Sequence, residues 1–269
     1  MFEKIIAIAG VPRSGTSWLG QIVDSSPHTA YRFQPLFSYA FKGAVDADSD
    51  KKGFQEFFEG IYTSADDFLL QTDKRNDGLY PTFRKMGDPE YLAFKTCRYQ
   101  YLLDRMLRYF ENLNLLGIVR HPCATINSWL KNQREFPKGA DPRKEWRSGS
   151  CRNEGRTEEF FGFYKWREVA YLYLDLAEKY PRQVRIIQYE SLVDAPVSVT
   201  QEVFDFLGLA FFEQTRSFLE ACHSIHLESP YAVFKDRSVK DNWKSELDRH
   251  IADEIIQDLT GTRLERFLK

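Results

Sequence analysis

The sequence predicts an α/β protein in which helices cover both faces of a parallel β-sheet. Three observations carry this prediction. Five short apolar runs recur along the chain, the segments between most of them have a helical period, and the first run leads into a turn bounded by two glycines. Strands that alternate with helices in this way form parallel sheets. No internal repeat or low-complexity linker divides the sequence, so residues 1–269 are expected to form a single domain.

The five apolar runs have the length of strands, and turn residues bound them. Leu113–Val119 is the most continuous run, which is typical of a parallel strand buried on both faces. The second run is broken by Gln34-Pro35-Leu36, because proline cannot donate a hydrogen bond to a strand ladder. The expected strands are residues 4–9, 29–33, 91–96, 113–119 and 184–189.

Amphipathic periods predict the helices. Residues 52–63 place four apolar side chains on one helical face, at Phe54, Phe57, Phe58 and Ile61. Further helices are expected at residues 18–23, 101–110, 122–131, 158–180, 197–207, 212–222 and 245–258. Three stretches are expected to lack regular structure, namely the polar loop 43–53, the irregular segment or lid 72–90 and the basic insertion 132–157.

The charge balance argues against a broad nucleic-acid-binding surface, because the formal net charge of the 269 residues is −2. It still allows a local basic pocket for one small anion. No apolar run approaches the roughly 18 residues of a membrane span, and the N-terminal run lacks the cleavage site of a signal peptide. The four cysteines show neither C-x-x-C pairing nor zinc spacing. The sequence therefore predicts a cytoplasmic protein without a metal site and leaves its oligomeric state open.

The turn after the first expected strand has the spacing of a phosphate-binding loop. Gly10 and Gly15 are separated by four residues and followed by Thr16-Ser17, as in the P-loop pattern G-x-x-x-x-G-K-[ST], except that Thr16 replaces the lysine. Arg13 is the only cation in the turn. Backbone N–H groups and a helix N-terminus at such a turn attract anions. We therefore expect a P-loop-like nucleotide-binding core; the alternative is an ordinary strand–turn–helix.

Residues 12–19, Pro-Arg-Ser-Gly-Thr-Ser-Trp-Leu, resemble a loop of the sulfotransferases that use 3′-phosphoadenosine 5′-phosphosulfate (PAPS). In that family the loop holds the 5′-phosphosulfate of PAPS. The resemblance implies that Trp18 stacks on the adenine, whereas the alternative role of Trp18 is to anchor the first helix in the core. The implied cofactor-binding residues of the loop are Arg13, Ser14, Gly15, Thr16, Ser17 and Trp18.

A second element of the resemblance lies at the end of the fourth expected strand. Arg120 ends that strand, and Ser128 follows eight residues later on the next helix. Ligands of open α/β sheets bind at the carboxyl ends of strands, where an arginine fork and a serine hydroxyl can both reach one phosphate. The pair resembles the 3′-phosphate site of the family. The alternatives are a strand-end salt bridge for Arg120 and a solvent-facing side chain for Ser128.

Three further elements match in order. Phe94-Lys95-Thr96-Cys97 resembles the K-T-P or K-T-H element, which implies that Lys95 faces the transferred sulfuryl group; Cys97 stands where some branches carry a catalytic histidine. Residues 188–196 resemble a structural R-Y-E-D-L-x-x-x-P element. Residues 235–244 resemble the late basic loop, with Arg237 shifted by one position and expected at the 3′-phosphate. For Lys95 and for this loop, simple exposure to solvent is the alternative.

The resemblance implies transfer of a sulfuryl group from PAPS to a hydroxyl or amine, with release of 3′,5′-ADP and without a metal. Arg13 and Lys95 are the expected catalytic residues. The acceptor, a small molecule, carbohydrate or lipid, is open. The general base is also open, because Gln34 stands where many relatives place a glutamate. His28, His121 and Glu56 are the remaining candidates for the base, unless Gln34 only orients the acceptor or the chain is inactive.

Two other functions fit part of the pattern. A P-loop kinase for small molecules would need a lysine at position 16 and an aspartate for magnesium after a buried strand, where Thr16 and Arg120 stand. A module that binds PAPS or another anion without catalysis would need no general base, which would explain why Gln34 stands in place of a glutamate.

Overall fold

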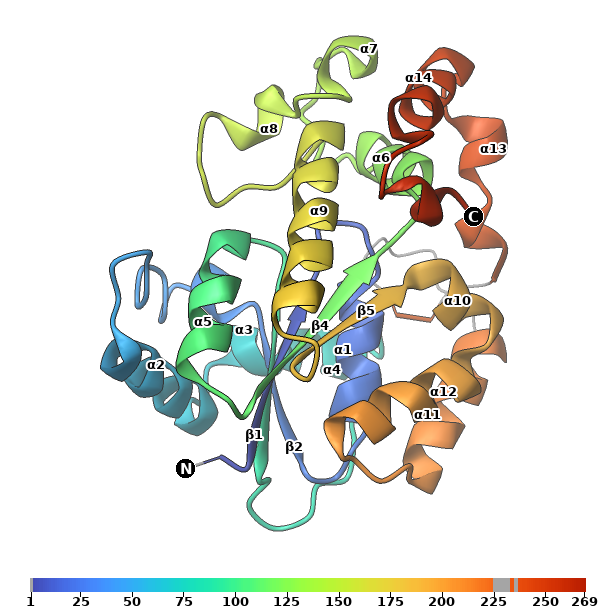
Figure 1. Ribbon diagram of the computed structural model, residues 1–269. Helices are drawn as coiled ribbons and strands as arrows, with labels where there is room; N and C mark the ends of the chain where they lie inside the picture. The colour runs from blue at the N-terminus through green and yellow to red at the C-terminus, as the bar shows by residue number, and fades with distance from the viewer. Residues whose placement is uncertain (1, 225–232, 235–236) are drawn as a thin grey trace.

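The computed structural model describes residues 2–224, 233–234 and 237–269 (Figure 1). Five strands form one sheet in the order β2-β3-β1-β4-β5, and every neighbouring pair is parallel. The strands are β1 (Lys4–Ala9), β2 (Thr29–Phe33), β3 (Tyr91–Thr96), β4 (Leu113–Val119) and β5 (Val184–Gln188). The predicted α/β fold with a parallel sheet is confirmed, and each strand lies within one residue of its expected bounds.

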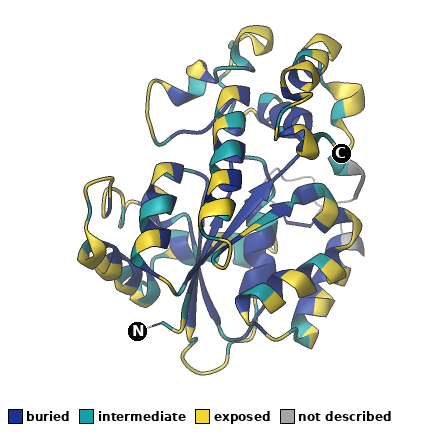
Figure 2. Cartoon of the chain, in the orientation of Figure 1, coloured by how far each residue is buried: buried dark blue, intermediate teal, exposed yellow. Residues whose placement is uncertain are grey.

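Helices cover both faces of the sheet, so its strands are buried on both sides (Figures 1 and 2). Every residue of β3 and β4 is buried, including the polar residues Lys95, Thr96 and Asn114, because both strands lie inside the sheet with helices on either face. Alternate residues of β1 enter opposite cores: Ile5 packs in one, and Ile6 in the other. The first core contains α2 (Lys51–Thr63), α5 (Leu103–Tyr109), α6 (Pro122–Leu130), α9 (Phe163–Lys179) and α14 (Arg249–Leu259). The second contains α1 (Thr16–Asp24), α10 (Tyr189–Asp194), α11 (Pro196–Leu207) and α12 (Glu213–Ser224).

Short helices fill the connections between these elements. The short α-helices are α3 (Asp67–Leu70), α4 (Thr72–Asn76), α7 (Pro142–Glu145), α8 (Ser150–Asn153) and α13 (Trp243–Glu246). The 3₁₀ turns are η1 (Pro35–Phe37), η2 (Gln100–Leu102), η3 (Arg237–Lys240) and η4 (Glu265–Leu268). The basic insertion 132–157 thus contains α7 and α8, which its sequence did not predict.

Two helices differ from their expected bounds for identifiable reasons. The helix expected at 158–180 begins only at Phe163, because Gly162 has a φ of +89°, and a Cβ there would lie 2.7 Å from the backbone nitrogen of Gly149. The helix expected at 245–258 is divided into α13 and α14. Leu247 is extended, and the Asp248 carboxylate then caps α14 by accepting a hydrogen bond from the backbone N–H of His250.

The segment 72–90 is tied to helix α1 by two partly buried ion pairs, although we expected irregular structure or a lid. Asp24, only 3% exposed, ends α1. Its two carboxylate oxygens lie 2.7 Å from Arg75 Nη2 and 2.7 Å from Lys85 Nζ. The segment therefore has two fixed points on the helix that follows the glycine turn.

In the part of the chain that the structure describes, no helix combines the length and the apolar surface that a membrane crossing requires.

Replacement of Asp24 by asparagine is expected to lower the free energy of unfolding by about 3 kcal/mol, since it removes a buried carboxylate and leaves two partly buried cations without a charged partner. Urea denaturation at pH 7 measures this loss. The matched control is Glu202→Gln, which breaks an exposed ion pair with Arg185 (3.0 Å) and should cost about 0–1 kcal/mol. Equal losses in the two variants would contradict the anchoring role of Asp24.

Candidate functional site

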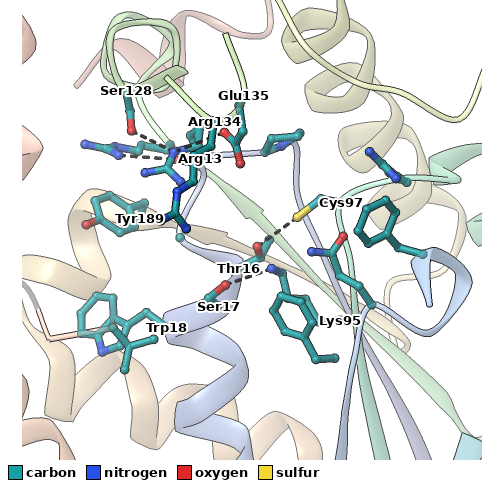
Figure 3. Close-up of a pocket in the computed structure, with 18 of the residues that line it drawn as sticks. Arg13, Thr16, Ser17, Trp18, Lys95, Cys97, Ser128, Arg134, Glu135 and Tyr189 are labelled. Atoms are coloured by element: carbon teal, nitrogen blue, oxygen red, sulfur yellow. Dashed lines mark hydrogen bonds and ion pairs between the residues drawn. The ribbon is translucent and has the colours of Figure 1, made fainter. Parts of the chain in front are cut away.

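A cavity of about 520 Å³ lies at the carboxyl ends of the strands (Figure 3). This is where open parallel sheets bind ligands, and the volume suits a small molecule. Segments that follow all five strands contribute to its wall. Its polar and charged lining includes Arg13, Thr16, Ser17, Gln34, Lys74, Lys95, Cys97, Arg98, Arg120, Ser128, Arg134, Glu135, Arg152 and Tyr189.

The turn between β1 and α1 is packed so closely that glycine is required at both ends. A Cβ on Gly10 would lie 2.7 Å from the Thr16 methyl group, and one on Gly15 would lie 2.5 Å from the Tyr189 ring. Gly15 has a φ of +93°, and Arg13 has a φ of +73°. These left-handed residues bend the backbone into a compact turn, a conformation in which successive N–H groups can converge on an anion.

Helix α1 starts at Thr16, and its N-cap residue is Gly15. Glycine has no side chain that could accept hydrogen bonds from the first N–H groups of the helix. Those N–H groups have no acceptor inside the helix, so an anion at the turn can satisfy them. Ser14 differs from the expectation. Its N–H donates to the carbonyl oxygen of Val11 at 3.3 Å, and its side chain is buried. The backbone donors that face the cavity therefore begin at Gly15.

Arg13 and Ser128, which the sequence assigned to opposite phosphates, lie together. Arg13 Nε donates a hydrogen bond of 3.1 Å to Ser128 Oγ. The same nitrogen lies 3.9 Å from a carboxylate oxygen of Glu135. The loop after β1 is thus joined to helix α6 and to the segment after it across the mouth of the cavity (Figure 3).

Arg120 is buried at the end of β4 and braces two loops. Its guanidinium carbon lies 4.7 Å from the centre of the Tyr189 ring. Nη1 donates to the carbonyl oxygen of Arg13 (3.3 Å), and Nη2 donates to that of Val239 (3.0 Å). Among the described residues, the buried Nε has no hydrogen-bond acceptor. An unmet donor of this kind fits an added anion.

The element of residues 188–196, which resembles R-Y-E-D-L-x-x-x-P, packs against the glycine turn and Arg120. Tyr189 begins α10, directly after β5, and its ring fills the space beneath Gly15. Burial raises the pKa of Glu190, whose carboxylate accepts a hydrogen bond of 2.9 Å from the backbone N–H of His121. The bond joins the ends of β5 and β4, so Glu190 has a structural role that links two strands of the sheet.

Lys95 lies inside the cavity wall and points towards the start of α1. Its Nζ donates a hydrogen bond of 2.9 Å to Ser17 Oγ and lies 4.3 Å from the centre of the Phe33 ring. Burial lowers the pKa of Lys95. Beside it, Thr16 Oγ1 and Cys97 Sγ are hydrogen-bonded at 3.2 Å. The end of β3 is thereby joined to the first turn of α1.

A second lysine, Lys74 of α4, was missed by the sequence analysis. Its Nζ lies 4.6 Å from the centre of the Phe33 ring, the same ring that Lys95 contacts. Burial and the positive charge of Lys95 lower the pKa of Lys74 to about 8. Only the fold of the segment 72–90 brings this residue to the cavity, so no local motif could have revealed it.

Two parts of the cavity wall differ in character. In one part, Trp18 packs edge-on against Tyr189 with ring centres 6.1 Å apart, near the apolar side chains of Val193, Cys222 and Val233. Elsewhere in the lining, phenylalanines contact cations. Lys74 lies 4.6 Å from the centre of the Phe33 ring, Arg98 lies 4.0 Å from that of Phe37, and Arg152 lies 5.2 Å from that of Phe161. Phe68 and Arg134 also line the cavity. The insertion 132–157 therefore does contribute to the wall, through Arg134, Glu135 and Arg152.

The three residues expected as possible bases do not line this cavity in the described structure. Glu56 is exposed on α2, and His28 packs near Phe212 with ring centres 5.8 Å apart. His121 caps α6 by accepting the N–H of Cys123 at Nδ1 (3.2 Å), and its ring stacks on that of Trp243. Gln34 does line the cavity.

The side chain of Arg237 lies outside the described residues. Its backbone belongs to the 3₁₀ turn η3, and Val239 of that turn accepts the hydrogen bond from Arg120. Among the side chains that the structure describes, no cluster of three or more histidine, cysteine, aspartate or glutamate residues is arranged to hold a metal ion.

Comparison with known proteins gives a consistent result. The model of the sulfotransferase family matches residues 6–213. A protein of Caenorhabditis briggsae named "Putative protein-tyrosine sulfotransferase" is 22% identical over 218 residues, which cover 79% of this chain and 68% of that protein.

Solved structures share the fold at low sequence identity. A sulfotransferase from Alicyclobacillus acidocaldarius is 17% identical with a TM-score of 0.52, and 98% of each chain is covered. Mouse sulfotransferase SULT7A1, solved in complex with PAP, is 15% identical with a TM-score of 0.59, covering 100% of this chain and 89% of that one. Retinol dehydratase in complex with retinol and PAP is 14% identical with a TM-score of 0.55, covering 98% and 83%.

The environment of His121 predicts a pH-dependent stability. Burial, reinforced by the positive charges of Lys244 and Arg120, lowers the pKa of His121 to about 4. The unfolded chain therefore binds this proton near pH 6.5, before the folded protein does, and stability falls as the pH drops from about 6.5 to 4 by about 3 kcal/mol.

The variant His121→Asn retains a side-chain oxygen to cap α6 but cannot titrate. Urea denaturation across pH 4–8 should give a correspondingly shallower loss of stability for this variant in acid. At pH 8 histidine is neutral in both the folded and the unfolded state, so the free energies of unfolding of the two proteins should differ only by a fixed amount. The same difference at every pH from 4 to 8 would contradict the lowered pKa of His121.

Proposed function

Because the chain belongs to the sulfotransferase family, we propose that it transfers a sulfuryl group from PAPS to a hydroxyl or amine and releases 3′,5′-ADP. One observation carries this proposal. The glycine turn, Arg13, Lys95 and Arg120 all meet in a single cavity at the carboxyl ends of the strands. We also propose that residues 1–269 act as one catalytic domain.

The turn suits the 5′-phosphate of the donor. Its backbone N–H groups, from Gly15 onward, converge at the positive end of α1, and the Arg13 side chain adds a full charge beside them. In this proposal Arg13 and the turn stabilise the negative charge that grows on the 5′-phosphate as it leaves.

Arg120 and Ser128 suit the 3′-phosphate. Both line the cavity, and Arg120 has an unmet buried donor within the described residues. The hydrogen bond from Arg13 to Ser128 implies that the donor must enter between these side chains and exchange one partner for a phosphate oxygen. Arg237 completes this group in the proposal. The PAP in complexes of the mouse sulfotransferase and retinol dehydratase is 3′,5′-ADP, which supports a site of this kind.

Trp18 and Lys95 mark the two ends of the bound donor. The apolar end at Trp18 suits the adenine, since base–aromatic stacking contributes on the order of 1–3 kcal/mol. Lys95, close to Ser17 and Phe33, then faces the sulfuryl group and stabilises its oxygens. The arginines and lysines supply the positive charge for the transfer, which positioning and electrostatics accelerate.

The acceptor occupies the part of the cavity that is lined by phenylalanines and cations. A small molecule, a carbohydrate or a lipid headgroup with a free hydroxyl or amine fits this class of wall. Retinol and androsterone are the small molecules present in the complexes of retinol dehydratase. A module that binds PAPS without catalysis is the second candidate, because Gln34 on the cavity wall cannot accept a proton.

Calorimetric titration with 3′,5′-ADP in the presence of a chelator tests the donor site. Wild-type protein should bind without metal. Arg120→Ala should weaken binding about 10- to 100-fold, as expected for hydrogen bonds to a charged group. Ser128→Ala should weaken it about 3- to 10-fold and leaves the backbone contacts of Arg120 in place.

The control for these variants is Arg185→Ala, an exposed arginine on β5 whose loss should leave the affinity unchanged. Binding of magnesium-ATP but not of 3′,5′-ADP would favour a P-loop kinase and contradict the proposal. Tight binding of 3′,5′-ADP without transfer to any acceptor would favour the non-catalytic module.

A further inference from the structure

Glu135 is the one carboxylate on the cavity wall among the described residues, and no described histidine accompanies it. Every other charged side chain in that lining is a lysine or an arginine. A carboxylate in such surroundings interacts favourably with the neighbouring cations.

The backbone holds Glu135 in place just after helix α6. Its N–H donates to the carbonyl oxygen of Asn132 at 2.9 Å, and the N–H of Phe136 donates to the same oxygen at 2.8 Å. Phe136 then packs edge-on against Trp129 of α6, with ring centres 5.2 Å apart. Glu135 therefore sits on a fixed turn between a helix and a buried aromatic side chain.

The carboxylate points into the cavity. Figure 3 shows its oxygens directed towards the space between Arg13 and Cys97. Oε2 is buried, lies 3.9 Å from Arg13 Nε, and within the described structure accepts no hydrogen bond. An ionised carboxylate offers about four lone-pair positions, so this oxygen keeps the capacity to accept a proton from a ligand.

The other candidates on the wall are poorer proton acceptors. Gln34 has no basic atom. Lys74, with its pKa lowered to about 8, is still mostly protonated at pH 7. Cys97 already shares a hydrogen bond with Thr16, at the first turn of α1, so its sulfur is less available to an acceptor hydroxyl.

We propose that Glu135 is the general base of the reaction, an inference that rests on the proposed sulfuryl transfer. The acceptor oxygen forms a bond to sulfur while the bond between sulfur and the bridging oxygen of the 5′-phosphate breaks. The electron pair of the broken bond stays on the 5′-phosphate, which departs as part of 3′,5′-ADP. The proton of the acceptor hydroxyl moves to the Glu135 carboxylate and is later released to water.

The same contacts allow a purely electrostatic role, in which Glu135 only neutralises Arg13 until the donor binds. The two roles predict opposite kinetics. A counterion alone would compete with the donor, so its removal would tighten binding of 3′,5′-ADP and leave turnover intact. A general base contributes about 10²- to 10⁴-fold to the rate of the chemical step.

The test measures PAPS turnover by Glu135→Gln with two acceptors, phenol and 4-nitrophenol, and with water through release of sulfate. The nitro compound gives up its proton far more readily, so it depends less on a base. For a general base, kcat with phenol or water should fall about 10²- to 10⁴-fold. The loss with 4-nitrophenol should be clearly smaller, while 3′,5′-ADP should bind at least as tightly as to wild type.

Chemical rescue adds a signature that a structural role would not produce. In Glu135→Ala, formate should restore part of the lost rate in proportion to its concentration. Glu154→Gln is the matched control, because Glu154 lies in the same insertion, exposed and paired with Arg156 (2.9 Å), and its loss should not change the rate. Thermal melting and the conservative variant Glu135→Asp separate misfolding from loss of the base.

Three results would overturn the inference. One is an unchanged kcat in Glu135→Gln. Another is an equal loss with phenol and 4-nitrophenol and no rescue by formate, as expected if Glu135 only orders the site while another group takes the proton. The third is a wild-type protein that binds 3′,5′-ADP but transfers to none of these acceptors. Failure to bind 3′,5′-ADP at all would instead contradict the donor site itself, on which the inference rests.

Discussion

Close packing beneath the glycine turn is the constraint on which the rest of the structure depends. Gly10 and Gly15 leave no room for a Cβ, because Ile118 of β4 and the Tyr189 ring fill the space below them. The same ring supports the Arg120 guanidinium. The turn, the end of β4 and the start of α10 therefore form one packed unit, and the proposed phosphate contacts share this support.

The cavity concentrates positive charge at a cost to stability that an anionic ligand would relieve. Seven of its lining side chains are cationic: Arg13, Arg98, Arg120, Arg134, Arg152, Lys74 and Lys95. Without a ligand, several of them use protein partners. Arg13 bonds Ser128, Arg120 bonds backbone carbonyls, and Arg98 pairs with Glu159 at 2.6 Å. Burial also lowers the pKa of Lys95, so its charge is costly in the cavity as well. A multiply charged donor would compensate these charges directly.

Local patterns predicted the sheet, and they identified most of the residues that we propose to bind the donor, because both depend on neighbours in sequence. Apolar runs gave all five strands, and the glycine turn and Arg120 lie at strand ends. The proposed acceptor side could not be predicted in this way. Lys74 and Glu135 lie in segments without a period, and only long-range contacts bring them to the cavity. His121 was a candidate for the general base because it is titratable and follows Arg120, but in the structure it caps a helix and stacks on Trp243.

A crystal structure of the protein with 3′,5′-ADP tests the central claim most directly. The account predicts the 5′-phosphate on the backbone N–H groups that begin at Gly15, with Arg13 beside it. It predicts the 3′-phosphate on Arg120 and Ser128, and the adenine against Trp18. A nucleotide bound in the reverse direction, or one that leaves the glycine turn empty, would contradict the account.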